Sequence, residues 1–170
     1  MLIAGIHLQS RLHSGADDRL DAIQDLIGDI TLEEKLLQHS NTIVIGDFNA
    51  NPFDKELTLK TGFNAVLYKE LIRRSENVEY RKKKYKRFYN PMLQIFSEDL
   101  RDYGSYYYSS DIDSLYWYSF DQVIVRKTLM DNLIGIQYCK KIKDKSLMNS
   151  VMPNLSISDH LPLIVSFGGM

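Results

Sequence analysis

The chain has 170 residues, of which 44% are hydrophobic and 25% are charged, with a formal net charge of −1. This ordinary globular profile fits one domain spanning 1–170 with a sizeable core. The single cysteine, Cys139, excludes a disulfide within the chain and favours a reducing, cytoplasmic compartment. The apolar opening at 1–6 is too short for a signal peptide or a membrane span, so it is expected to be a strand.

The first third of the chain predicts a strand–helix–strand unit. Residues 2–8 are expected to form a buried strand, and a second apolar, β-branched strand is expected at 42–45, before Gly46. Between them Ser14 and Asp17 resemble a capping box, and four apolar residues follow at helical spacing: Leu20, Ile23, Ile27 and Ile30. Thr31 offers a second cap, so one bent helix or two successive helices remain open. The unit predicts a helix packed on a sheet.

The remaining sequence alternates short helices with strands. Helices are expected from about 54 to 60, over 66–73, and for one or two turns after Pro91. Strands are expected at four places: 106–108, 115–125, 133–139 and within 157–167. Pro162 indicates that the last strand is an edge strand or begins after the proline.

Polar side chains capable of catalysis follow or precede four of these apolar strands. His7 ends the first strand, Asp47 and Asn49 follow the second, and Asp121 opens the run Asp-Gln-Val-Ile-Val. Ser-Asp-His, with Asp159 and His160, precedes Leu-Pro-Leu-Ile-Val. Each motif alone is also typical of a turn or a cap. Their order along the chain predicts that the side chains meet at one end of neighbouring strands.

This ordered series resembles the endonuclease/exonuclease/phosphatase superfamily, whose fold is that of deoxyribonuclease I. The motifs Ile-His-Leu-Gln-Ser, Gly-Asp-Phe-Asn, Asp-Gln-Val and Ser-Asp-His span nearly the whole chain. The resemblance implies an α+β fold, in which a β-sandwich is flanked by outer helices in four α/β/β/α layers. It also implies an enzyme: a Mg²⁺-dependent (or Mn²⁺-dependent) phosphodiesterase or nuclease-like hydrolase.

The resemblance also implies roles for the individual residues. Asp159 would bind the metal, and His160, oriented by Asp121, would work on the scissile phosphate. Asp47 would position or deprotonate the attacking water, and Asn49 would donate to a phosphate oxygen. His7 would contact the phosphate as a second histidine. The other histidines, His13 and His39, have no motif around them and are expected at the surface.

Two features of the family have no counterpart in this sequence. The asparagine that follows the family's first strand and the glutamate that is its principal metal ligand would both precede the strand ending in His7. We therefore expect the C-terminal portion of such an enzyme, with the N-terminal strands missing. An exposed apolar sheet face would follow, with self-association or a partner covering it, and with low activity for the isolated chain.

The substrate is indicated by charge and aromatic content. Residues 73–87 contain eight Lys or Arg and two Glu, and six of the basic residues form one run: Arg81, Lys82, Lys83, Lys84, Lys86 and Arg87. Basic side chains bind phosphate backbones and aromatic faces stack on bases, so nucleic acid is the first expectation. Residues 103–120 contain eight aromatic residues, most of them expected in sheet packing and one or two near Asp121.

Two other interpretations stay open. A phosphoinositide-type phosphatase would use the same family chemistry on a different phosphoester. A non-catalytic remnant could instead bind polyanions or a partner through the basic run. The absent glutamate favours the remnant, whereas the presence of Asp47, Asn49, Asp121, Asp159 and His160 favours the enzyme.

Overall fold

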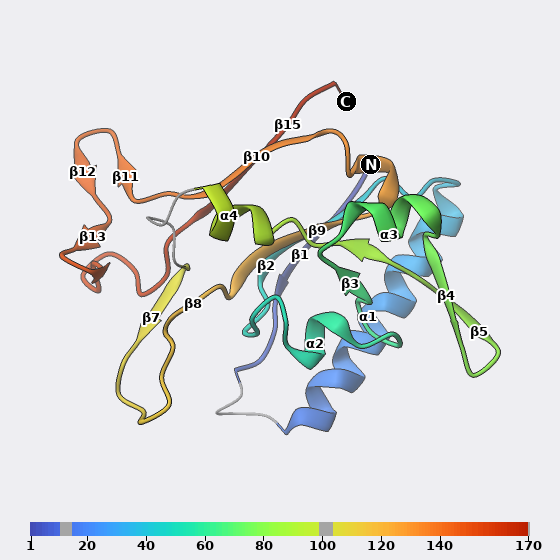
Figure 1. The fold of residues 1–170 in the computed structure, drawn as a ribbon, viewed down its shortest axis with the longest axis horizontal. Coiled ribbons are helices and arrows are strands. Elements are labelled where there is room, and N and C mark those ends of the chain that lie inside the picture. The colour runs from blue at the N-terminus through green and yellow to red at the C-terminus, as the bar shows by residue number, and fades with distance from the viewer. Residues whose placement is uncertain (11–14, 99–103, 170) are drawn as a thin grey trace.

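The computed structural model describes residues 1–10, 15–98 and 104–169. Its centre is a five-stranded mixed sheet in the order β1-β2-β9-β6-β3 (Figure 1). β1 (Leu2–His7) runs parallel to β2 (Thr42–Asp47), and β9 (Asp121–Val125) runs antiparallel to β2. β6 (Phe88–Tyr89) and β3 (Ala65–Val66) complete the sheet. The chain therefore has a mixed α/β fold built on one main sheet.

One face of this sheet is covered by α1 (Ala16–Leu36), which connects β1 to β2. Apolar side chains of the helix pack with those of the strands in a buried cluster that includes Ile23, Ile30, Val44, Phe48 and Ile124. The helix is continuous across Thr31, whose hydroxyl donates to the carbonyl of Ile27 at 2.7 Å. The expected second cap at Thr31 is therefore wrong. Ser14 lies outside the described residues, and the N-cap is Gly15.

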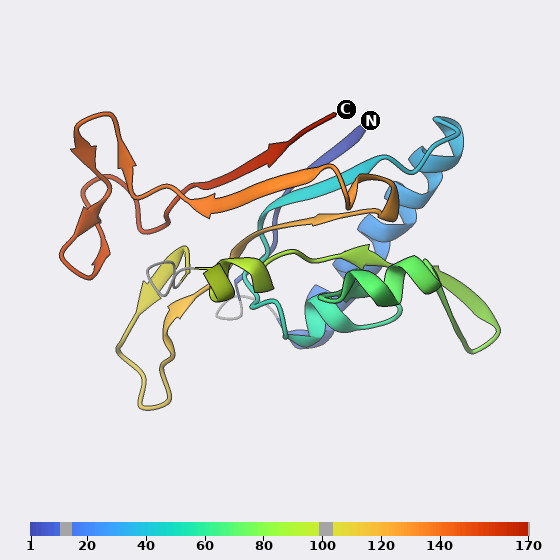
Figure 2. The same ribbon diagram turned by 45° about the horizontal axis from the view of Figure 1, so that its top comes forward.

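The other face carries a two-stranded antiparallel sheet of β10 (Leu133–Tyr138) and β15 (Leu163–Phe167). Figure 2 shows these two strands running over β2 and β9. The second buried cluster joins the two sheets and includes Ile43, Val123 and Val125, with Leu163 and Val165 packed against it. β15 begins directly after Pro162, as the proline indicated. The described residues thus form a helix layer, a main sheet and a smaller sheet, and none of their helices covers the outer face of β10–β15 (Figure 2).

The remaining elements are short. The helices are α2 (Lys55–Thr58), α3 (Lys69–Arg74), α4 (Leu93–Glu98) and the 3₁₀ turn η1 (Lys127–Leu129). The hairpins outside the main sheet are β4–β5 (Asn77–Tyr80, Lys83–Lys86), β7–β8 (Tyr106–Tyr108, Tyr116–Tyr118), β11–β12 (Lys141–Ile142, Lys145–Ser146) and β13–β14 (Met148–Asn149, Met152–Pro153). No helix in the described part of the chain is both long and apolar enough to cross a membrane.

Two buried ion pairs fix α1 to its surroundings. Arg126, directly after β9, donates from Nε to Oε1 of Glu34 on α1 at 2.8 Å, and both side chains are almost fully buried. Arg126 also donates from Nη1 to the carbonyl of Lys86 at 3.0 Å and lies over the Phe88 ring. At the other end of α1, Arg19 contacts Glu56 at 3.0 Å. Buried charges require such partners. The first pair therefore holds α1 against the end of β9, and the second holds α1 against α2.

Candidate active site

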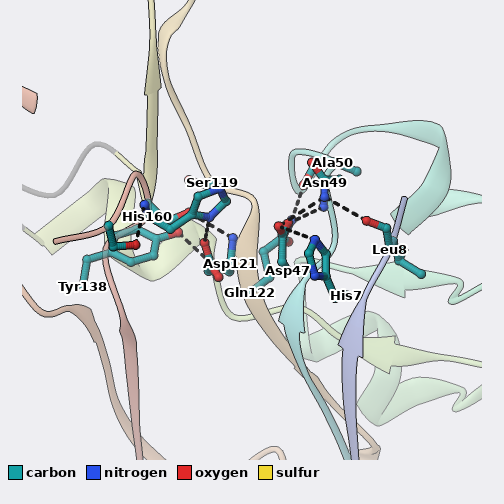
Figure 3. Close-up of polar contacts among 12 residues, drawn as sticks. His7, Leu8, Asp47, Asn49, Ala50, Ser119, Asp121, Gln122, Tyr138 and His160 are labelled. Atoms are coloured by element: carbon teal, nitrogen blue, oxygen red, sulfur yellow. Dashed lines mark hydrogen bonds and ion pairs between the residues drawn. The ribbon is translucent and has the colours of Figure 1, made fainter. Parts of the chain in front are cut away.

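The candidate site lies where β1 and β2 end and β9 begins. Because β1 and β2 are parallel and β9 is antiparallel to both, these three strand ends meet at the same edge of the sheet. The strand register pairs His7 with Asp47, and Asp47 with Asp121. Figure 3 shows these side chains in a row along the edge, with His160 contributed by the loop before β15. The structure thus brings His7, Asp47, Asn49, Asp121 and His160 together, as the motif order predicted.

The shortest contact in this row joins the side chains of His160 and Asp121. Nδ1 of His160 lies 2.6 Å from Oδ2 of Asp121, and both side chains are between 21% and 23% exposed. Both backbones are held in place, since Asp121 N–H donates to Ser105 Oγ at 3.0 Å and His160 N–H donates to Ser158 Oγ at 3.1 Å. Asp121 therefore fixes the ring orientation and leaves Nε2 as the nitrogen that can exchange a proton with a substrate.

The electrostatic environment favours the protonated form of His160. Burial lowers the pKa of the imidazole, but the hydrogen bond that it donates to Asp121 and the negative charges of Asp121, Asp47 and Asp159 raise it by more. The net effect is a pKa above the ordinary histidine value. A raised pKa means that the neutral imidazole binds a proton more strongly than an exposed histidine does, which suits it to act as a base.

Asp47 is held by the residues that flank it. The backbone N–H of Asn49 donates to Oδ1 at 2.8 Å, and the side-chain amide of Asn49 donates to Oδ2 at 3.1 Å. His7 Nε2 lies 3.5 Å from Oδ2, although the His7 side chain is 78% exposed. Burial raises the pKa of Asp47, the Asn49 backbone hydrogen bond opposes this shift, and the neighbouring Asp121 adds to it. The carboxylates of Asp47 and Asp121 thus lie beside each other at neighbouring strand ends, and the charge of Asp121 disfavours ionisation of Asp47.

The geometry gives Asn49 a different role from the expected one. Its amide nitrogen donates to both Asp47 Oδ2 and the Leu8 carbonyl, the latter at 2.8 Å. A side-chain amide has two N–H groups, so both are engaged within the protein. Donation to a phosphate oxygen is not available in this arrangement. Instead Asn49, with its left-handed backbone at φ 45°, orients the carboxylate of Asp47.

Gly46 explains how β1 comes close enough for His7 to reach Asp47. Its φ is +142°, and a Cβ built on it would lie 2.0 Å from the carbonyl oxygen of Ile6. A side chain at this position would push the two parallel strands apart. The glycine of Gly-Asp-Phe-Asn is therefore a packing requirement of the site and not merely a turn residue.

Asp159 stands apart from the hydrogen-bonded row. Its side chain is exposed, and its negative charge raises the pKa of both Tyr106 and His160, although burial is the larger cause for Tyr106. Within residues 1–10, 15–98 and 104–169, no three His, Cys, Asp or Glu side chains lie close enough to form a metal site. Mg²⁺ commonly binds one or two carboxylates and completes its shell with water and substrate phosphate. Asp159 is an exposed carboxylate of the kind that takes part in such partial coordination.

The six basic residues expected to bind substrate do not lie at this edge. Residues 77–86 form the hairpin β4–β5, which is anchored beside Arg126 at the end of β9 opposite to Asp121. Arg87 is used internally, because its Nη1 donates to the carbonyls of Ser75 and Asn77 at 2.7 and 2.5 Å. The hairpin projects at one end of the molecule, away from β7 and β8 (Figures 1 and 2). The run therefore lies away from the His160–Asp121 pair, and its binding of substrate stays a prediction.

Several residues that support the site were not singled out from the sequence. Tyr138 donates its hydroxyl to the carbonyl of Asp121 at 3.0 Å, and buried Gln122 donates to the carbonyl of Ala50 at 2.5 Å. Buried Arg19 donates to the carbonyl of Asn49 at 3.1 Å. Gln122 carried a usable signal, since a fully buried polar residue inside an apolar strand needs a specific partner. Arg19 and Tyr138 carried none, because their partners are distant in sequence.

Aromatic residues form one wall beside the imidazole. The Tyr106 ring lies 4.9 Å from the His160 ring and stacks on Phe120 at 5.4 Å with an interplanar angle of 18°. Tyr118 lies 5.2 Å from Phe120. The expectation that a few aromatic residues lie near Asp121 is confirmed for Tyr106 and Phe120, while Tyr103 lies outside the described residues.

Comparison with solved structures finds a similar fold in the 3′ phosphatase NExo from Neisseria, which was solved bound to a product DNA hairpin. The likeness covers 98% of this chain with a TM-score of 0.51 and a sequence identity of 12%. It shows the fold. It also covers 61% of the NExo chain, so this chain spans about three fifths of that protein's length. Neither protein-family models nor curated protein sequences give a match.

Proposed function

We propose that this chain is a phosphoester hydrolase that acts on nucleic acid, or the portion of one that contains the acid–base residues. The observation that carries the proposal is the 2.6 Å contact between His160 and Asp121 at the same sheet edge as Asp47. An imidazole fixed by a carboxylate, with its second nitrogen free for chemistry, is the acid–base unit of many hydrolases. The fold shared with a DNA 3′ phosphatase supports this choice of substrate class.

The reaction we propose is the attack of water on phosphorus. Neutral His160 takes the water proton at Nε2 while Asp121 stabilises the imidazolium through Nδ1. The new phosphorus–oxygen bond replaces the bond to the leaving group, which takes a proton from solvent and departs as the alcohol, and the His160 imidazolium then returns its proton to solvent. Asp47 is the alternative base, because its raised pKa gives it more affinity for that proton than an exposed carboxylate has. Exposed His7, beside Asp47, is placed to contact the phosphate.

We propose Mg²⁺ or Mn²⁺ as the cofactor, with Asp159 as the protein carboxylate that binds it. When bound, such an ion would neutralise charge on the phosphate and on the departing oxygen. Asp159 is adjacent in sequence to His160, which places its carboxylate and the imidazole on the same loop.

The finer architecture is also a proposal. Apolar side chains remain exposed on the smaller sheet and on the edge strand β1: Ile134 at 71%, Ile164 at 40% and Ile3 at 58%. Soluble proteins rarely leave such side chains and a free strand edge uncovered together. We propose that a further layer, from a second copy or a partner, covers them and completes the four-layer sandwich. A mass measurement across a dilution series tests this, and a monomer at every concentration contradicts self-association.

The proposed activity is tested with defined DNA substrates. A 3′-phosphorylated hairpin reports phosphomonoesterase activity, and a supercoiled plasmid reports nicking; each is incubated with Mg²⁺, Mn²⁺ or a chelator. We expect metal-dependent product from the wild-type chain and none from His160→Ala. Asp159→Ala should raise the metal concentration required. Equal product with and without chelator, or from wild type and both variants, would overturn the proposal.

A further inference from the structure

A basic arm leaves and re-enters the fold at the candidate site. The arm comprises residues 139–159 and contains the hairpins β11–β12 and β13–β14. It begins after Tyr138, whose hydroxyl contacts the Asp121 backbone, and it ends at His160. Its two ends are tied together, because Cys139 N–H donates to the carbonyl of Pro162 at 2.7 Å. The arm is therefore attached to both members of the His160–Asp121 pair.

The base of the arm is packed and is not a loose excursion. Leu147 is buried with Tyr138 and Leu161 in a third apolar cluster, which also holds Met92 and Ile95 of the α4 region. Within the arm, Leu147 N–H donates to the Lys140 carbonyl and Asn154 N–H donates to the Leu147 carbonyl, both at 2.8 Å. These contacts hold the β11–β12 hairpin in a defined direction (Figure 1).

The β11–β12 hairpin is strongly basic and exposed. Lys141, Lys143 and Lys145 are exposed, and Asp144 is the single acidic residue among positions 141–146. None of the ion pairs within the described ranges involves these three lysines. The register pairs Lys141 with Ser146 and Ile142 with Lys145, so Lys141 and Lys145 lie on opposite faces, and Lys143 lies at the tip. Positive charge thus surrounds the hairpin.

We propose that Lys141, Lys143 and Lys145 bind backbone phosphates of the nucleic acid on the His160 side of the scissile phosphate. This inference rests on the proposed function, and it assigns the polyanion contact to the arm instead of to β4–β5. Flexible lysine side chains neutralise phosphates without reading sequence, and several of them together raise the local concentration of a polyanion near the catalytic edge. Substrate would reach His160 along a surface that is attached to it.

A nucleic acid strand fits this surface better than a flat anionic membrane does. Lys141 and Lys145 lie on opposite faces of the hairpin, so a flat surface laid against one face does not meet the lysine on the other. The neighbouring β7–β8 hairpin, which is in contact with β14, carries exposed Asp111 and Asp113 near its tip. A planar anionic surface broad enough to touch both hairpins would be repelled there, whereas a strand can follow the arm alone.

The test measures binding in the His160→Ala background, so that substrate is not consumed. Fluorescence anisotropy follows a labelled DNA hairpin at several salt concentrations. In the arm variant, Lys141, Lys143 and Lys145 are replaced by alanine. The plot of log affinity against log salt has a negative slope. We expect its magnitude to decrease by about 2.7, at about 0.9 for each duplex phosphate that is no longer neutralised. Replacement of the same lysines by arginine should keep the slope, because the charge is retained.

The β4–β5 hairpin supplies a matched control with the same number of charges removed. Alanine at Arg81, Lys82 and Lys83 should leave the slope unchanged, because this hairpin lies at the far end of the molecule. An unchanged slope in the arm variant, an equal decrease in the control variant, or binding only to phosphoinositide vesicles and not to DNA would overturn the inference. A reduced slope without hydrolysis by the wild type would support the arm and contradict the proposed function. Hydrolysis by the wild type, together with an unchanged slope in the arm variant, would support the proposed function and contradict the role of the arm.

Discussion

The two ends of strand β9 carry pairs of opposite character. At its start, Asp121 contacts His160, and both side chains are about one fifth exposed. Directly after its end, Arg126 contacts Glu34, and these side chains are 1% and 8% exposed. In the His160–Asp121 pair, Nε2 of the imidazole is left for chemistry. In the Arg126–Glu34 pair, Glu34 also accepts from Thr42, and Arg126 also donates to the carbonyls of Lys86 and Arg87. One strand therefore joins a titratable site to a structural ion pair.

The comparison shows why burial alone does not locate a functional site. A cavity of about 460 Å³ lies at the Arg126 end, between α1 and the β4–β5 hairpin, and His160 does not line it. The catalytic candidates instead lie at the strand ends, where the side chains of Asp121 and His160 are about one fifth exposed. A buried pair with every partner supplied stabilises the fold, while a partly exposed pair can exchange protons with a substrate.

The largest expected effect comes from Asp121→Asn. The amide keeps the shape of the side chain, but it no longer stabilises the imidazolium or selects the tautomer that exposes Nε2 as a base. We expect hydrolysis to fall by about 10²- to 10⁴-fold, the range of one acid–base contribution, with little change in folding stability. Single-turnover rates and urea unfolding measure the two effects. If Asp121→Asn instead lowers the free energy of unfolding strongly and leaves the hydrolysis rate unchanged, the Asp121 end of β9 is structural and not catalytic.

Arg126→Ala should give the opposite result. It leaves the Glu34 carboxylate buried without its partner, so we expect the free energy of unfolding to fall by about 3–5 kcal/mol. Chemical denaturation measures the decrease. Replacing both members, with Arg126→Met and Glu34→Leu, should recover much of that stability, because an apolar pair leaves no buried charge. If the double variant is less stable than Arg126→Ala, the ion pair is not the cause.

A smaller effect is expected from Asn49→Gly. Glycine tolerates the left-handed backbone but removes the amide that orients Asp47. We expect the hydrolysis rate to fall by roughly 10-fold, less than for removal of the whole acid–base unit. The KM for the substrate should be unchanged, because the Asn49 amide donates to Asp47 and to the Leu8 carbonyl. Asn64→Gly is the matched control, since Asn64 also has a left-handed backbone, at φ 49°, outside this row. A rise in KM alone would restore the expected phosphate contact of Asn49.

The smallest effect concerns stability against pH. The pKa of His160 is raised in the folded state, so its imidazolium stabilises the fold below the ordinary histidine pKa. That contribution disappears as the pH rises through the raised folded-state pKa. The difference in unfolding free energy between wild type and His160→Gln should therefore shrink from pH 5.5 toward pH 9. A difference that grows with pH would mean that the folded-state pKa is lowered.

The sequence could predict the site because its residues are tied to strand ends. His7, Asp47 and Asp121 each border an apolar run, and strands paired with these ends in register bring the three residues together. The strand after Pro162 and the helix between the first two strands followed from equally local signals. The full hydrogen bonding of the Asn49 side chain could not be predicted, because one of its two bonds depends on the approach of Leu8, 41 residues away.

The basic run was harder to place from the sequence. Six charges in seven residues indicate an exposed surface, but they do not tell which edge of the sheet that surface borders. Arg126 contacts the carbonyls of Lys86 and Arg87 and holds the β4–β5 hairpin in place. These are backbone atoms, so the residue types in the run do not predict the contact. The arm lysines show the reverse case, since their charge run is weaker but follows β10, whose last residue, Tyr138, contacts the Asp121 carbonyl.

The central claim is that the imidazole at the β9 start performs the chemistry. Its most direct test is the single-turnover hydrolysis of a DNA hairpin with one scissile phosphate by wild type, His160→Gln and His39→Gln. His39 lies beside the cavity at the Arg126 end, so it matches the substitution without sharing the site. We expect the rate to fall by at least about 10²-fold for His160→Gln and to be unchanged for His39→Gln. Equal rates for the two variants, or no hydrolysis by the wild type with Mg²⁺ or Mn²⁺, would contradict the account.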